Sequence, residues 1–288
     1  MNGNCTPDSR PSVAVQVSES EVLRAVRSFP AGSAGRPDKV SPQHVLEMVN
    51  CVEAGSELVS ALTGFTNCLL QGDIHPEVSP ILFGGNLIAL EKKSGGVRPI
   101  AVSYTLRRIA AKCANIYAAS QLADHFSPIQ LGDRIAGGCE AAVHAAIRYI
   151  DAMPDGFVVA KTDFSNAFNS LRRDLMLCSV SEAVPSIYRF CHLSYSQPSI
   201  LKYKTRTILS QEGPHQGDPL GPLLFCLSIH RDLVQLNCTP TPHLSLNFAF
   251  LVVHLIALLH TKFEVLALAV TEIFRGGGSG NLKVGHVT

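Results

Sequence analysis

Apolar side chains recur every three or four residues over much of the chain, which is the spacing of one face of a helix. Val22, Val26 and Phe29 show this spacing in the first such segment. Gly and Pro interrupt the pattern, and Ser41-Pro42 is typical of an N-cap followed by the first helical residue. Helices are therefore predicted over residues 19–29, 42–52, 56–71, 104–126, 139–152, 167–180, 185–196 and 218–236.

Short apolar runs bounded by turn residues predict strands between these helices. The predicted strands cover residues 86–92, 97–102, 156–162, 199–204 and 206–211. Ser94-Gly95-Gly96 separates the first two strands, which is a hairpin signal. Because helices and hairpins occur without a regular strand–helix alternation, the sequence predicts an α+β fold.

Residues 244–261 form a long apolar segment without a charged side chain. Its length alone is marginal for a membrane span. Asn247, His254 and His260 are costly in lipid, and no basic residues flank the segment closely. We expect no membrane span here, and a buried strand, a buried helix and a decayed tail stay open.

The composition excludes a wholly disordered chain, because 46% of the 288 residues are hydrophobic and only 16% are charged. A net charge of +1 excludes nucleic-acid binding by bulk charge alone, but it is compatible with a local basic groove. The nine Cys show no CxxC or other paired spacing, which favours reduced intracellular thiols over a disulfide framework. No secretory leader is expected from the polar first residues.

Asp163 is the first candidate for chemistry, because it follows the predicted strand 156–162 and precedes a predicted helix. A carboxylate at the end of a strand can hold a hard cation such as Mg²⁺, which prefers oxygen ligands. The alternative is that Asp163 only caps the helix that begins nearby.

The glycine-rich loop QEGPHQGDPLGP, residues 211–222, is the second candidate. Its small residues allow a ligand to approach the backbone, and Gln216 is placed to contact a nucleotide or a template base. The alternative is an ordinary turn, with Asp218 as a helix cap and Pro219 as the first helical residue.

A run of cations between residues 92 and 112 is the third candidate, and Glu91 is the only acid beside it. The cations are Lys92, Lys93, Arg98, Arg107, Arg108 and Lys112. Such a run beside a glycine-rich hairpin tip suits a triphosphate or a phosphate backbone. The alternative is a solvated face.

The order of these features resembles the reverse transcriptase family, in particular the polymerases of non-LTR (LINE-like) retrotransposons. KKSGGVRPIAV resembles the fingers hairpin of that family, KTDFSNAFNSL its first palm motif and QGDPLGPLLF its second. Residues 32–38 resemble a segment that precedes the fingers. The resemblance spans residues 32–236, which is most of the chain.

The resemblance implies the fingers and palm of a right-hand polymerase, with an incomplete C-terminal palm and thumb. It divides the chain into a leader and helix (1–30), a fingers-like region (31–155), a palm-like region (156–243) and a divergent apolar tail (244–288). The implied reaction is RNA-directed DNA synthesis, with an RNA template, a DNA primer, deoxynucleotides and Mg²⁺ but no small organic cofactor. The implied location is the nucleus or the cytoplasm.

The resemblance also implies roles for individual residues. Asp163 would bind the metal ions with the Phe164 carbonyl, and Phe168 would lie under the sugar and exclude a 2′-hydroxyl. The implied nucleotide-binding residues are Lys92, Lys93, Arg98, Phe168, Gln216 and Gly217. Arg98, with Lys92 or Lys93, would hold the triphosphate.

The chain departs from the family at the second acidic palm motif. Phe250-Leu251-Val252-Val253 has the frame of that motif, with valine where two aspartates are required. Valine cannot coordinate a metal, so we predict little or no polymerase activity. The alternatives are a non-catalytic nucleic-acid-binding remnant, a membrane-tethered protein that uses 244–261, and an unselected gene fragment.

Overall fold

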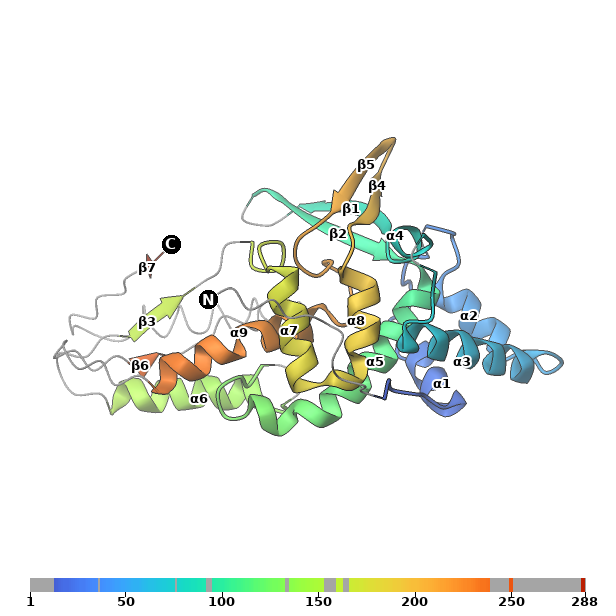
Figure 1. The fold of residues 1–288 in the computed structure, drawn as a ribbon. Coiled ribbons are helices and arrows are strands. Elements are labelled where there is room, and N and C mark those ends of the chain that lie inside the picture. Colours follow the sequence, from blue (N-terminus) through green and yellow to red (C-terminus); the bar gives the residue numbers. More distant parts are fainter. Residues whose placement is uncertain are drawn as a thin grey trace. The chain divides into compact units, whose positions relative to one another are not determined.

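The computed structural model describes residues 13–35, 37–75, 77–91, 95–132, 135–152, 159–162, 166–238, 249–250 and 286–287 (Figure 1). Helices accompany two small sheets, so the predicted α+β class is confirmed. The chain divides into two compact units, one from residues 1–122 and 168–228 and the other from residues 123–167 and 229–288. The four-part division that the family resemblance implies stays a prediction.

The helices of the described residues agree with most of the predicted ones. They are α1 (Glu19–Arg27), α2 (Pro42–Val49), α3 (Gly55–Gln71), α4 (Ser79–Leu82), α5 (Thr105–Phe126), α6 (Gly138–Asp151), α7 (Arg173–Ala183), η2 (Pro185–Ile187), α8 (Tyr188–Tyr195) and α9 (Gly221–Cys238). Helix α2 begins as predicted, because the Ser41 hydroxyl accepts a hydrogen bond from His44 N (3.2 Å) and Pro42 is the first helical residue. Helix α3 ends at Gly72, whose φ of 74° suits glycine.

The first unit contains a four-stranded sheet in the order β2-β1-β4-β5. Its strands are β1 (Gly85–Glu91), β2 (Val97–Ser103), β4 (Ser199–Tyr203) and β5 (Arg206–Ser210). β1–β2 and β4–β5 are antiparallel hairpins, and β1 pairs in parallel with β4 over two residues. The β1–β2 hairpin and the two strands of the second hairpin were predicted, but the sequence did not show that they share one sheet.

The register of this sheet assigns its residues to two faces, because paired residues point to the same side and successive ones alternate. Gly85 pairs with both Leu201 and Ser103, so the buried residues Ala101, Ser103 and Leu201 share one face. Arg98 and Lys202 lie on the opposite face, and both are exposed.

Two helices begin later than predicted. Residues 167–170 form a turn, and α7 begins only at Arg173, because the Phe168 carbonyl packs against Gly213 and the backbone of Arg172 is still extended. Helix α9 begins at Gly221 instead of 218, because the Asp218 side chain and backbone oxygens accept bonds from Leu220 N and Gly221 N and close a turn first.

The second unit contains a small parallel sheet in the order β6-β3-β7, made of β3 (Val159–Thr162), β6 (Ala249–Phe250) and β7 (His286–Val287). Strand β3 falls within the predicted strand 156–162. Among the residues that the structure describes, no helix is long and apolar enough to cross a membrane. Apart from β6, the apolar segment 244–261 lies outside those residues.

Candidate functional site

The glycine-rich loop lies along the free edge of β2. Ala101 N donates a hydrogen bond to the Gln216 carbonyl at 2.7 Å, and β2 is the outer strand of its sheet. Gly217 has a φ of 112°, and a Cβ atom there would lie 2.7 Å from the Ala101 carbonyl oxygen. Only glycine allows this approach. The hairpin motif and the QGDP motif, far apart in the sequence, therefore meet at one joint.

Phe168, in the segment KTDFSNAFNSL, contacts the same loop. Its ring stacks on that of Phe225, with centroids 5.5 Å apart and planes 7° apart, and the residue is 7% exposed. Its carbonyl oxygen occupies the space of a Cβ at Gly213, and its ring leaves no room for one at Gly221. The segment around Phe168 and the loop thus fit together through two glycines.

Arg98, three residues before Ala101 on β2, and Gln216 in the loop differ in exposure. Arg98 is an exposed residue of β2, and it pairs with Leu90 across the β1–β2 hairpin. Gln216 is half-buried, and its Oε1 atom is buried without a hydrogen-bond partner among the described residues. An unpaired buried amide oxygen is unfavourable unless a donor reaches it. Gln216 is therefore a candidate for contact with a ligand.

A buried ion pair, which was not predicted from the sequence, anchors the glycine-rich loop to α5. Arg107 of α5 is fully buried, and its Nη2 atom lies 2.5 Å from Asp218 Oδ2. The Tyr195 hydroxyl donates to the same carboxylate oxygen, and Arg107 Nη1 donates to Ser103 Oγ at 3.1 Å. Burial alone would raise the pKa of Asp218, but Arg107 and Tyr195 hold that pKa below its usual range.

Three cations of the basic run make contacts within the fold. They were predicted either to bind phosphate or to form a solvated face. Arg107 pairs with Asp218, and the charged groups of Arg108 and Lys112 lie 4.8 and 4.5 Å from the ring centroid of Phe29. Arg108 also donates to the Ala34 carbonyl at 2.8 Å. These contacts connect α5 to the loop and to the segment after α1. Among the described residues of the run, Arg98 alone is exposed and makes no ion pair, ring contact or hydrogen bond of this kind.

A second cluster clamps the base of the β4–β5 hairpin onto the loop. His215 Nε2 lies 2.9 Å from Ser199 Oγ and 3.1 Å from Ser210 Oγ, and these two serines face each other across the open end of the hairpin. Arg173 donates to the carbonyl oxygens of Ser210 (2.8 Å) and Gly213 (3.0 Å). The orientation of the hairpin is thereby fixed relative to the joint.

Several predicted site residues lie outside the described residues. They are Lys92, Lys93, Asp163, Phe164, Val252 and Val253. Within the described part of the chain, no three His, Cys, Asp or Glu side chains gather as metal ligands would. Comparison of the chain with models of known protein families and with curated proteins gives no match.

Proposed function

We propose that the chain is a reverse transcriptase-like domain that binds nucleic acid and has lost most or all nucleotidyl transfer. The observation that carries this proposal is the joint between β2 and the glycine-rich loop, where Ala101 N donates to the Gln216 carbonyl at 2.7 Å. A nucleotide pocket built from the fingers hairpin and the second palm motif requires these segments to be adjacent. The contacts of Phe168 with Gly213 and Gly221 bring the end of the first palm motif to the same loop.

In this proposal each residue at the joint has a chemical task. Arg98 is exposed and can bind phosphate through two parallel hydrogen bonds. Gln216 offers its unpaired Oε1 atom to a nucleotide, and Gly217 keeps the backbone open to a sugar or base. The Phe168–Phe225 stack forms a rigid apolar support beneath the loop.

The side chains available do not fit a pair of Mg²⁺ ions. Mg²⁺ requires several oxygen ligands in near-octahedral geometry, and two ions require more than one carboxylate. Asp163 is the carboxylate that the first palm motif supplies, while Val252 and Val253 stand in the second motif. Asp218 is already paired with Arg107. We therefore assign no catalytic step through these ions, and we expect binding without efficient turnover.

Primer extension and binding, measured on the same preparation of the full chain, test the proposal. The substrates are an RNA template annealed to a DNA primer, deoxynucleotides and Mg²⁺. We expect the chain to bind the annealed template, with an affinity that falls as salt rises, and to extend the primer no faster than its Asp163→Asn variant. The matched control, Arg27→Gln, removes an exposed cation from α1 and should leave binding unchanged.

Two outcomes would contradict separate parts of the proposal. Extension that is lost in Asp163→Asn would show an active polymerase, and the predicted loss of turnover would be wrong. Absence of salt-sensitive binding would remove the nucleic-acid function altogether. Extension gained by Val252→Asp with Val253→Asp would support the lineage directly, because it would restore the carboxylates that the second palm motif lacks.

A further inference from the structure

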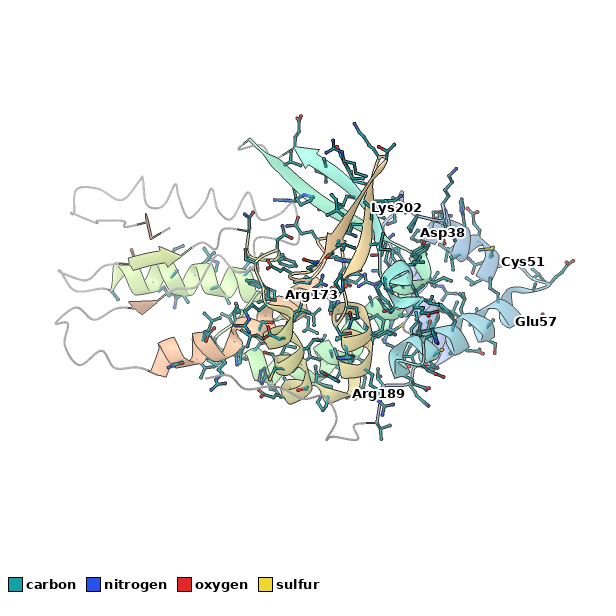
Figure 2. All side chains as sticks on the ribbon, turned by 45° about the horizontal axis from the view of Figure 1, so that its top comes forward. Asp38, Cys51, Glu57, Arg173, Arg189 and Lys202 are labelled. Carbon is teal, nitrogen blue, oxygen red and sulfur yellow. The ribbon has the colours of Figure 1, made fainter. Side chains whose placement is uncertain are left out.

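The tip of the β4–β5 hairpin is a basic surface that the family resemblance does not explain. It carries three exposed cations within five residues, Lys202, Lys204 and Arg206, and residues 199–210 contain no acid. Figure 1 shows this hairpin projecting beside the β1–β2 hairpin, and Figure 2 shows Lys202 on it. We name these three residues the hairpin cations. Such an unneutralised group attracts a polyanion.

The hairpin is rigid at its base and open at its tip. His215 and Arg173 hold Ser199 and Ser210 at the base, and the residues from Lys204 to Leu209 are all exposed. Fixed cations bind a polyanion with a smaller loss of conformational freedom than cations on a mobile loop. The hydrogen bonds at the base therefore favour a binding role for the tip.

We infer that the hairpin cations bind the phosphate backbone of a nucleic-acid strand, which extends the binding surface beyond the joint. This inference rests on the proposed function and names a separate contact surface for it. Lys202 lies on the same sheet face as Arg98, and the residues paired with them on β1, Asn86 and Leu90, are separated by roughly 13 Å along the strand. A strand held at Arg98 could thus extend across this face to Lys202 and pass over the tip at Lys204, beyond which Arg206 lies on the opposite face through its pairing with Tyr203.

The side chains around the cations suit a nucleic acid better than a purely acidic polypeptide. The Tyr203 ring is half-buried, with Lys204 Nζ 5.7 Å from its centroid, and Ile208 and Leu209 are 46% and 54% exposed. Proteins that bind single strands combine cations for the phosphates with flat or apolar side chains for the sugars and bases. A competing interpretation is that the cations only prevent the edge strand β5 from pairing with other chains.

The test measures binding of the full chain to fluorescein-labelled single-stranded RNA by anisotropy, between about 50 and 200 mM salt. The variant is Lys202→Gln/Lys204→Asn/Arg206→Gln, in which asparagine suits the left-handed φ of 52° at position 204. The matched control, Arg27→Gln/Arg189→Gln/Arg231→Gln, removes three exposed cations elsewhere. Loss of three phosphate contacts should make the negative slope of log K against log salt shallower by about 2, in the hairpin variant only.

The possible results separate this inference from the proposed function. If the wild-type chain binds RNA and both variants keep its slope, the inference is wrong and the proposed function stands. Equal losses in the two variants would show a general charge effect and also overturn it. If only the hairpin variant aggregates while its RNA affinity is unchanged, the cations protect the edge. If polyglutamate displaces the labelled RNA as well as unlabelled RNA does, the hairpin cations suit an acidic protein partner and the inference is wrong. If the wild-type chain binds no RNA, both proposals fail.

Discussion

Arg107 Nη2 lies 2.5 Å from Asp218 Oδ2, and both side chains are wholly buried. The pair joins the first turn of α5 to the loop that carries Gln216 and Gly217. The Tyr195 hydroxyl and Leu220 N also donate to the carboxylate. The position of the candidate site therefore depends on an ion pair that no ligand can reach directly.

Removing one member of this pair should destabilise the protein strongly. Arg107→Met leaves the Asp218 carboxylate buried without its cation, and we expect a loss of about 3–5 kcal/mol in the free energy of unfolding. Arg107→Met combined with Asp218→Leu should recover much of that loss, because no charge is left unpaired. Urea unfolding of the three proteins measures both effects. A double variant no more stable than Arg107→Met would show that the pair is not what holds the loop.

The same cluster predicts how stability depends on pH. Burial, together with the charges of Arg107 and Arg173, lowers the pKa of His215 to about 3. The histidine of the unfolded state has a pKa of about 6.5, so between that pH and about 3 only the unfolded state takes up the proton. The folded state loses stability as pH falls through this window, by up to about 1.4 kcal/mol per pH unit.

A substitution isolates the contribution of His215 from that of the carboxylates. His215→Gln keeps a polar side chain near Ser199 and removes the titrating group, so its free energy of unfolding should vary less between pH 6 and pH 4 than that of the wild type. His75→Gln, at an exposed position, serves as the control. Identical pH dependence in wild type and His215→Gln would contradict the assignment.

The local structure could be predicted from the sequence where local signals decide it. Ser41-Pro42 started α2, and the glycines at 95 and 96 marked the β1–β2 hairpin. The start of α7 could not be predicted, because the Phe168 carbonyl packs against Gly213 from a distant part of the chain. The parallel pairing of β1 with β4 is likewise a tertiary contact without a local signal.

In the candidate site, too, some features could be predicted from the sequence and others depend on tertiary contacts. The order of the motifs predicted that the hairpin and the glycine-rich loop would lie together, but nothing in the sequence identified Ala101 as the residue that contacts Gln216. The position of Arg107 in its helix does carry a sequence signal for the ion pair. It lies three and seven residues before Ala110 and Ala114, on a helix stripe whose alanines are fully buried. A cation on an alanine stripe predicts a buried partner.

Gly217 should be less tolerant of a side chain than a glycine with a similar backbone in open space. Gly217→Ala introduces a Cβ 2.7 Å from the Ala101 carbonyl oxygen at a φ of 112°. Gly95→Ala adds a Cβ at a φ of 86°, and no described residue beyond its chain neighbours has an atom within 4 Å of it. We expect a loss of about 1–2 kcal/mol from backbone strain in Gly95→Ala and a clearly larger loss in Gly217→Ala. Chemical denaturation compares the free energies of unfolding of the two variants. Equal losses would mean that the loop can shift away from β2 without cost.

Arg98 and Arg107 belong to the same basic run but should respond differently to substitution. Arg98 is exposed, so Arg98→Gln should change the free energy of unfolding by less than about 0.5 kcal/mol. It should weaken binding of RNA or a deoxynucleoside triphosphate, because a phosphate partner is lost. Arg107→Gln should unfold at lower urea concentration, because it leaves Asp218 buried without its cation. Titration with each ligand beside urea unfolding separates these effects. Unchanged affinity in Arg98→Gln would remove this arginine from the binding site, since its exposed side chain makes no hydrogen bond or ion pair with the residues that the structure describes.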